Sequence, residues 1–242
     1  MTIGSEFKSS GITENTPKKI MLGAGTIHRG LKFGYTLLET QPEDWETNFA
    51  NYYSKSTSEG NDTYTKLSAK TTWAANKYYR PGWNFKESLI CATSGGSKVS
   101  IVPEFYDVPV DGALVKVKGL TVKTGETAKM EVNPIELTPE IFKMALIGDE
   151  KASPVATGYS EITSRAIINE GDYLTHMAYV GKTIEGKPII IVFDYALCTS
   201  GLEIEGKNKE AAVPKFTFEC FADLTPEADT LPYHIYYPTP AA

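Results

Sequence analysis

The sequence predicts a mainly β protein with antiparallel strands and one flanking helix. Two observations predict this class: several segments alternate apolar and polar residues, and only one segment carries the start signals of a helix. Strict alternation is typical of a strand that buries one face and leaves the other in water. The chain has 242 residues, of which 41% are hydrophobic and 22% charged. That length and composition suffice for one β domain with an appendage or for two small domains.

The strand signals dominate the later part of the chain. Apolar and polar residues alternate in residues 115–118, 128–133 and 215–220, so each segment is expected to form a half-buried strand. Residues 189–193 are apolar throughout, which predicts a strand covered on both faces. Glu185-Gly186 separates two such apolar segments and predicts the turn of a hairpin.

The helix signal lies near the middle of the chain. Thr138 is a suitable N-cap, Pro139 fits the first helical position, and Glu140 complements the positive end of the helix dipole. Gly148 predicts the end of this helix. We therefore expect a helix over about residues 138–147.

Composition divides the chain into an arm, a domain and a tail. Residues 1–19 are polar and are predicted to form a flexible N-terminal arm, in which residues 4–7 could be a cloning scar. Residues 20–238 are predicted to form one β domain, followed by a short tail over residues 239–242. Within the domain, residues 39–88 are predicted to be an aromatic-rich insertion or long loop. Excursions of this length are often functional.

This insertion holds all three Trp residues of the chain and two Tyr pairs. It is too aromatic for a disordered linker, so its rings are expected to pack either on their own domain or on a neighbouring subunit. Packing between subunits is the favoured interpretation, because aromatic side chains are enriched at protein interfaces. The alternative is a platform on which sugars or bases stack. The aromatic residues concerned are Trp45, Tyr52, Tyr53, Trp73, Tyr78, Tyr79 and Trp83.

Charge and hydropathy argue against two further classes, a protein that grips nucleic acid and a membrane protein. The chain carries 24 Lys and Arg residues against 30 Asp and Glu residues, a formal charge of −6, whereas nucleic-acid binding needs a positive surface. The longest apolar run is far shorter than the ~20 residues of a membrane helix, and the first residues lack the apolar core of a signal peptide. We therefore expect a soluble protein that is made in a cytoplasm and has no membrane partner.

No constellation of residues indicates catalysis, so the chain is not expected to be an enzyme or to bind a metal or cofactor. Residues 23–25 (Gly-Ala-Gly) lack the third glycine of a dinucleotide fingerprint and are interpreted as a turn. Residues 94–96 (Ser-Gly-Gly) lack the frame of a nucleophile elbow. The dispersed histidines are expected at surfaces or interfaces, and the dispersed cysteines as reduced, buried thiols. They are His28, His176, His234, Cys91, Cys198 and Cys220.

Eleven short motifs together resemble a known family. In chain order they are LGAG at residues 22–25, ATSGGS at 92–97, PEFYD at 103–107, VDGA at 110–113, VKGL at 117–120, LTPE at 137–140, GDY at 171–173, IIIVFDYA at 189–196, GLE at 201–203, FTFECF at 216–221 and LPYHIYYP at 231–238. In this order and spacing they resemble the major tail tube proteins of siphophage-type bacteriophages or prophages of Gram-positive bacteria, whose tails are non-contractile. The resemblance covers residues 18–34 and 91–238 and is interrupted at residues 35–90.

The resemblance implies a β-sandwich or barrel-like domain with a flanking helix. It also implies a structural, virion protein whose subunits form hexameric rings, stacked into a hollow phage tail tube through which DNA is ejected. Its implied partners are copies of itself, the tail tip or baseplate, the tape measure protein and the tail terminator protein. DNA would pass through the lumen without sequence-specific binding. The implied localisation is the virion, after synthesis in the cytoplasm of the host bacterium.

Two alternative functions stay open from the sequence. One is the inner tube of a contractile particle or of a secretion-type injection apparatus, since type VI secretion tube proteins share the tube architecture. The other belongs to a different class, a carbohydrate-binding β-sandwich module that uses Trp45, Trp73 and Trp83.

A tube subunit also needs joints and a wall that lets DNA slide. Exposed strand edges would pair between neighbouring subunits, and the polar N-terminus, residues 39–88 and the proline-rich end are candidate arms. An acidic inner wall would repel phosphates. The acidic residues that are candidates for such a wall, each of which could equally be an ordinary solvent-facing residue, are Glu104, Asp107, Glu131, Glu203 and Glu219.

Overall fold

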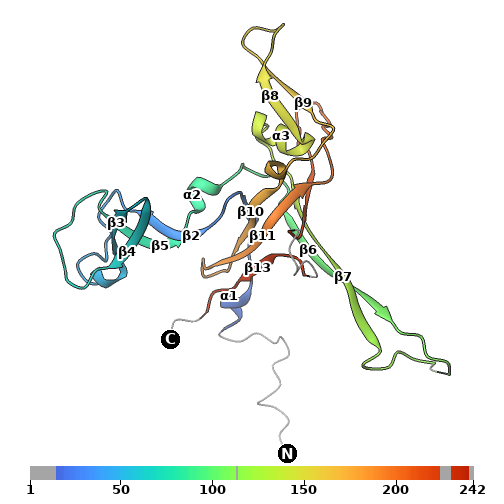
Figure 1. Ribbon diagram of the computed structural model, residues 1–242, viewed down its shortest axis with the longest axis horizontal. Coiled ribbons are helices and arrows are strands. Elements are labelled where there is room, and N and C mark those ends of the chain that lie inside the picture. Colours follow the sequence, from blue (N-terminus) through green and yellow to red (C-terminus); the bar gives the residue numbers. More distant parts are fainter. Residues whose placement is uncertain (1–14, 113, 224–229, 240–242) are drawn as a thin grey trace, which may run out of the picture. The chain divides into compact units, whose positions relative to one another are not determined.

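The computed structural model describes residues 15–112, 114–223 and 230–239 (Figure 1). The chain divides into two compact units. The small unit is Leu31–Ser88, and the large unit comprises the chain up to Gly30 and from Leu89 onward. The protein is mainly β with antiparallel sheets and few helices, which confirms the predicted fold class.

Some sequence predictions fall outside the described residues. Of the predicted arm, only its end is described, where residues Thr16–Lys19 form the short helix α1. The candidate cloning scar at residues 4–7 and all but the first residue of the predicted tail at 239–242 lie outside the described residues. Among the described residues, no helix is long and apolar enough to cross a membrane.

The large unit is built on one seven-stranded sheet. Its order is β1-β10-β11-β12-β7-β6, and β13 also pairs with β11. All of these pairings are antiparallel. The strands are β1 (Thr26–His28), β6 (Lys98–Asp107), β7 (Thr121–Val132), β10 (Leu174–Lys182), β11 (Pro188–Cys198), β12 (Phe216–Cys220) and β13 (Tyr233–Tyr236).

The predicted hairpin joins two neighbouring strands of this sheet, β10 and β11. Strands β10 and β11 pair along their length, and the turn between them contains Gly186 at φ +81°, a left-handed conformation that glycine adopts without strain. The Thr183 N–H donates to the Lys187 carbonyl at 2.9 Å and closes the turn. The predicted hairpin at Glu185-Gly186 is confirmed.

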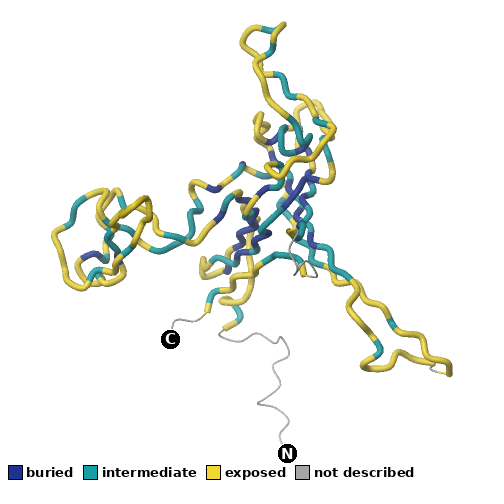
Figure 2. Tube along the Cα trace, viewed as in Figure 1, coloured by how far each residue is buried: buried dark blue, intermediate teal, exposed yellow. Residues whose placement is uncertain are grey.

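The core packs against the strands of the large sheet, and β11 is buried on both faces. The alternation predicted in β7 and β12 places Ala128, Met130 and Val132 beside Phe216, Phe218 and Cys220, and all six side chains are buried. Figure 2 shows the buried segments in dark blue along the strands of the large sheet. In β11, Ile190 and Val192 are buried on one face and Phe193 on the other, as the continuous apolar run predicts.

The predicted helix is α3 (Pro139–Leu146). The Ile141 N–H donates to the Thr138 hydroxyl at 3.4 Å, so Thr138 is the N-cap, and Ile141 and Ala145 pack into the core. The predicted stop at Gly148 is off by one residue. Ile147 takes the left-handed conformation at φ +51° that ends the helix, and Gly148 already begins strand β8 (Gly148–Ala152). Strand β8 pairs with β9 (Ser160–Ser164) in a separate two-stranded sheet.

The strand predicted at residues 115–118 is wrong. These residues lie in the loop between β6 and β7, and Val115 is 77% exposed. Gly112 at φ +83° and Gly119 at φ +95° make turns on either side of them. An alternation of valine and lysine can thus occur in an exposed loop as well as in a half-buried strand, so this pattern alone does not distinguish a loop from a strand.

The small unit has a sheet of its own, with four antiparallel strands in the order β2-β5-β3-β4. The unit begins before the predicted insertion at residue 39, because β2 pairs with β5 along its whole length. Strand β3 pairs with β5 at only two positions and then continues against β4 alone. The elements are β2 (Phe33–Leu37), the 3-10 turn Phe49–Asn51, β3 (Tyr53–Ser58), β4 (Asn61–Lys66), β5 (Tyr78–Trp83) and α2 (Phe85–Ser88).

Candidate assembly interface

Strand β6 forms an open border of the large sheet. It pairs with β7 along all ten of its residues, and within the described part of the chain no strand lies on its other side. Alternate N–H and C=O groups of an edge strand point outward, so β6 offers about five of each to a neighbour. Pro103 has no N–H, which is why proline in a strand is typical of an edge. Regular pairing is therefore most complete along residues 98–102.

Strands β6 and β7 continue beyond the rest of the sheet as a two-stranded ribbon. Strand β12 pairs with β7 only from Lys129 to Val132, so residues 121–128 of β7 have β6 as their sole partner strand in the described structure. A register shift between Glu104 and Phe105 marks a bulge in the ribbon. An isolated two-stranded ribbon is marginally stable in water and normally requires further packing.

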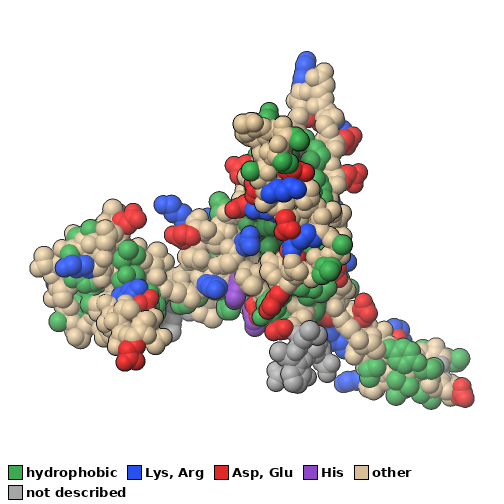
Figure 3. Space-filling view, turned by 45° about the horizontal axis from the view of Figure 1, so that its top comes forward, with side chains coloured by type: hydrophobic (Ala, Val, Ile, Leu, Met, Phe, Trp, Pro, Cys, Tyr) green, Lys and Arg blue, Asp and Glu red, His purple; other side chains and the backbone are tan. Residues whose placement is uncertain are grey.

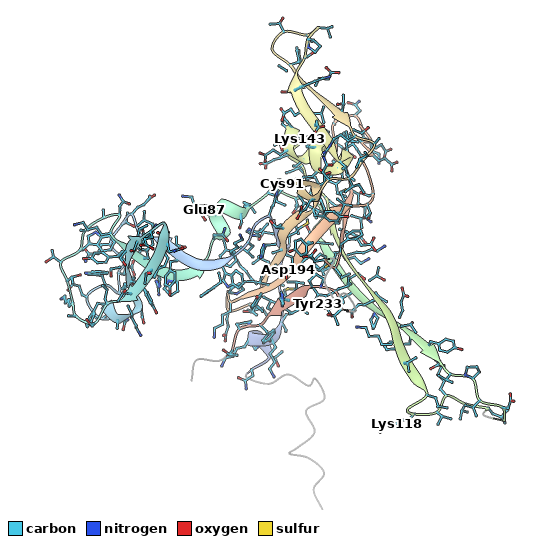
Figure 4. The ribbon with its side chains drawn as sticks, in the orientation of Figure 1. Glu87, Cys91, Lys118, Lys143, Asp194 and Tyr233 are labelled. Atoms are coloured by element: carbon cyan, nitrogen blue, oxygen red, sulfur yellow. The ribbon has the colours of Figure 1, made fainter. Side chains whose placement is uncertain are left out.

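The end of this ribbon is unusually apolar. Phe105 is 64% exposed, and in the following loop Leu114 is 99% and Val115 77% exposed. Hydrophobic side chains gather over this end in Figure 3, and Figure 4 marks Lys118 at its tip. A hollow of about 310 Å³ lies between the loop and the strand ends, and Val108, Val110, Val117 and Leu120 are among the residues that line it. An exposed apolar patch of this kind is typical of an interaction surface.

Sequence reasoning missed this surface because it interpreted the valines as one face of a strand. A signal was present in the same segment. Pro109, Gly112 and Gly119 are turn-forming residues that bracket the apolar stretch, and such bracketing favours a loop.

Three of the five predicted wall residues share one face of the large sheet. Residues paired across adjoining strands point to the same side of a sheet, and Glu104 is paired with Gly125, Glu219 with Lys129 and Glu131 with Thr217. Gly125, Lys129 and Glu131 all belong to β7 and are an even number of positions apart, so they lie on the same side. Asp107 lies at the end of β6, beyond the bulge, and Glu203 lies in the exposed loop between β11 and β12. The structure therefore brings Glu104, Glu131 and Glu219 together on one face and leaves Asp107 and Glu203 apart.

That shared face has a mixed charge. Glu131 binds the Lys215 ammonium at 2.6 Å and the Lys98 ammonium at 3.0 Å, and these contacts hold the pKa of its carboxyl below the usual value. Glu219 pairs with Lys129 at 3.4 Å. Glu131 and Glu219 thus each have a cation beside them, so this part of the face carries both charges where the sequence suggested an acidic wall.

Asp107 is also compensated locally. The Lys116 ammonium lies 2.5 Å from its carboxylate and the Thr121 hydroxyl donates to it, and both interactions lower the pKa of Asp107. Because Lys116 belongs to the second half of the apolar loop and Asp107 to the end of β6, this ion pair ties the loop back to the strand.

The aromatic residues of the small unit form two clusters. In the first, the Trp45 ring contacts Tyr52 and Trp73 at centroid distances of 5.0 Å each and Tyr78 at 4.6 Å. Trp45 is 1% exposed and Tyr52 is fully buried, so both pack inside their own unit and cannot face another subunit. This corrects the expectation of an inter-subunit contact for these two residues.

The Tyr52 phenol is tied to two charged groups at the edge of the first cluster. Its hydroxyl donates to the Asp44 carboxylate, and the Arg80 guanidinium lies 5.7 Å from its ring centroid. Burial, followed by the hydrogen bond to Asp44, raises the pKa of Tyr52 to about 12.

The second cluster lies on the opposite face and is more open. Tyr35 stacks on Tyr64 at 4.0 Å, and Tyr53 and Tyr79 lie beside this pair. Trp83 contacts Phe33 edge-on at 5.5 Å. Tyr53, Tyr79 and Trp83 are half-buried, so contact of these residues with a neighbouring subunit stays a prediction, as it does for Trp73 and Tyr78.

Of the two glycines that resembled part of a dinucleotide fingerprint, Gly25 has a packing role and Gly23 takes a left-handed conformation at φ +88°. A Cβ on Gly25 would lie 2.2 Å from the ring of Tyr179, so the side chain of Tyr179 occupies the space beside this glycine. Of the histidines, His28 is buried and contacts the Thr26 hydroxyl at 2.8 Å, which corrects its predicted surface position. His234 lies 3.3 Å from Asp194.

The thiols are buried, as predicted for all three cysteines. Burial raises the pKa of Cys91 to about 11 and that of Cys220 to about 12. Over residues 15–112, 114–223 and 230–239, no three His, Cys, Asp or Glu side chains converge in a way that could hold a metal ion.

Neither a protein-family model nor a curated protein sequence matches the chain.

Proposed function

We propose that this protein is a self-assembling structural subunit, which forms hexameric rings that stack into the hollow tail tube of a siphophage-type bacteriophage or prophage. The observation that carries the proposal is the joint exposure of the open β6 border and the apolar ribbon end, because both surfaces call for a partner. The ordered motifs that resemble tail tube proteins supply the identity of the tube.

The two surfaces suit the two contacts that a stacked tube requires. Backbone groups along residues 98–102 would pair with a strand of the neighbouring subunit in the same ring. The ribbon end projects apolar side chains such as Leu114 past the sheet and would bury them against another subunit. Such head-to-tail contacts close into rings within a layer and extend as a filament between layers.

The mixed charge around Glu131 and Glu219 suits a wall along which DNA slides. A face whose carboxylates are balanced by lysines neither grips phosphates strongly nor requires an acidic excess. In the same proposal, the tail tip or baseplate, the tape measure and the tail terminator proteins are the heterologous partners, and the assembled tube belongs to the virion.

Electron microscopy of concentrated protein tests this function. Purified chain at increasing concentration, at raised salt and after brief heating is examined by negative stain, with light scattering on the same samples. Rings and hollow tubes of constant width are the expected result. A monomeric mass under every condition, with no tubes on the grids, would contradict it.

A further inference from the structure

A groove in the small unit has the chemistry of a ligand site that tube assembly does not require. It has a volume of about 470 Å³ and is lined entirely by residues of Leu31–Ser88, from strand β3 and from the turn and first residues of β5. Volumes of this size are typical of small-molecule sites.

The lining combines hydroxyl, amide and ammonium groups with aromatic rings. Asn76 contributes an amide, Lys77 an ammonium group and Tyr79 a ring. The hydroxyls of Ser54 and Thr57 donate to the Thr65 carbonyl and the Asp62 carboxylate, so toward a ligand they serve as acceptors. Hydroxyl and amide groups both donate and accept hydrogen bonds, as sugar hydroxyls do, while aromatic rings pack against the C–H faces of sugar rings. This combination matches an oligosaccharide better than a purely apolar or purely ionic ligand.

The groove is held in shape before any ligand binds. Asn76 stands in the left-handed conformation at φ +58°, and its N–H donates to the Leu38 carbonyl at 3.0 Å. The Tyr78 hydroxyl lies 2.8 Å from that of Thr71, and the Tyr79 ring packs edge-on against Tyr64 at 5.1 Å. Such preorganisation lowers the entropic cost of binding.

Charge favours a neutral ligand over a phosphate polymer. Residues 31–88 contain seven Lys and Arg residues and seven Asp and Glu residues. Lys55, which also lines the groove, is paired with Asp62 at 2.7 Å. A nucleic acid would require an excess of free positive charge, which this unit lacks.

We propose that the Leu31–Ser88 unit binds a neutral oligosaccharide in this groove, with Tyr79 as the stacking ring and Asn76 and Lys77 as hydrogen-bond donors. This modifies the carbohydrate alternative that the sequence left open. Of the three tryptophans invoked there, Trp45 is buried and Trp73 packs on it, so tyrosine and asparagine take the place of tryptophan. The site goes beyond tube formation and would let an assembled tube attach to a glycan surface.

Saturation-transfer NMR on the full chain tests the site. The probes are the neutral hexasaccharides of β-1,4-glucose, β-1,4-N-acetylglucosamine and α-1,4-glucose, with oligogalacturonate and a single-stranded DNA decamer as charged comparisons and an extended neutral decapeptide as a strand mimic. Saturation transfer to at least one neutral hexasaccharide, and to neither charged polymer, is expected. Two substitutions at exposed residues of the groove, Asn76→Gly and Lys77→Gln, should each weaken that binding by about fivefold or more. Glycine at position 76 keeps the left-handed backbone, so the first substitution removes only the amide.

The matched control is Asn208→Gly, which changes an exposed turn of the large unit and should leave binding unchanged. Absence of transfer to every neutral sugar would overturn the proposal, as would binding of the decapeptide or a charged polymer alone. Sugar binding that both groove variants leave intact would overturn it as well. Tube formation by the same variants is scored separately by electron microscopy, so loss of the sugar site and failure of assembly give different results.

Discussion

Gly148 faces the backbone carbonyl of Thr163 so closely that a Cβ built on Gly148 would lie 2.7 Å from that oxygen. The two residues belong to adjacent strands, β8 and β9, whose first register pair is Gly148 and Ser164. Glycine is therefore required here by the approach of two backbones, whereas the helix end itself is made by Ile147.

Substitution Gly148→Ala should destabilise the large unit. The obstructing atom is a backbone oxygen, so the strands must move apart, and we expect a loss of about 1–3 kcal/mol in the free energy of unfolding. Urea denaturation followed by far-UV circular dichroism measures it. Tryptophan fluorescence is unsuitable, because all three Trp residues lie in the small unit.

The matched control for this prediction is Gly206→Ala. A Cβ at Gly206 meets nothing within 4 Å, so its substitution should cost little. Equal stability of the two variants would show that the close approach at Gly148 is not a constraint.

Tyr52 predicts an alkaline transition in the small unit. Its pKa of about 12 in the folded protein exceeds the ordinary 10.0, so its contribution to stability is complete below pH 10 and is lost as the pH rises towards 12. Tyr52→Phe removes this titration together with the hydrogen bond to Asp44. We expect the variant to lose about 1 kcal/mol at pH 7 and to show a smaller further loss between pH 10 and 12. Tryptophan fluorescence during urea unfolding reports on this unit.

Tyr159→Phe serves as the reference for that experiment. Tyr159 is 73% exposed and lies in the large unit, so its substitution should leave the alkaline slope of the small unit unchanged. If Tyr52→Phe and wild type lost stability in parallel above pH 10, the proposed role of the Tyr52–Asp44 pair would be wrong.

The buried thiols should resist alkylation in the folded protein. The raised pKa values of Cys91 and Cys220 keep the reactive thiolate scarce at pH 8, and burial also blocks access. Iodoacetamide labelling, read by peptide mass spectrometry, should be slow in buffer and fast in concentrated guanidinium chloride. Rapid labelling of Cys220 in buffer would contradict its placement in the core.

The apolar ribbon end predicts a separation of folding from assembly. The double substitution Leu114→Asp and Val115→Asp places charges on two highly exposed side chains, so the unfolding free energy should change by less than about 0.5 kcal/mol. Assembly should be lost, because two carboxylates would have to be buried in the contact. Light scattering and negative stain measure the assembly.

Val155→Asp is the control for this surface effect. Val155 is 91% exposed in the loop between β8 and β9, away from the β6–β7 ribbon in sequence. Val155→Asp should leave assembly intact. If Val155→Asp abolished assembly and the Leu114→Asp, Val115→Asp variant preserved it, the contact between subunits would not be at the ribbon end.

The sequence predicted those elements whose local signals agree with their tertiary setting. The start signal at Thr138-Pro139 agrees with the apolar side of the helix that follows, which packs on the core. The alternation of Phe216, Phe218 and Cys220 likewise agrees with a strand that buries these side chains on one face. The non-consecutive neighbours, such as β12 between β11 and β7, depend on contacts distant in sequence, and no local pattern encodes them.

The small unit and the candidate surfaces were harder to predict for a physical reason. Its sheet carries rings on both faces, with Tyr52 on one and Tyr53 on the other, so the period-2 signal disappears. The groove beside Tyr79 depends on the offset between β3 and β5, which is a property of their register. At the ribbon end, Val115 is exposed although it is apolar, which inverts the rule that apolar residues lie inside.

Hydrogen exchange along β6 tests the central claim most directly. Outward-facing amides of residues 98–102 have no partner strand in the described single chain, so they should exchange rapidly in dilute protein. In concentrated, assembled protein, mass spectrometry should show slowed exchange in this segment and in the loop 108–120, with β8 and β9 unchanged. An assembled sample in which residues 98–102 still exchange at the dilute rate would contradict the proposal that copies of the chain complete this border.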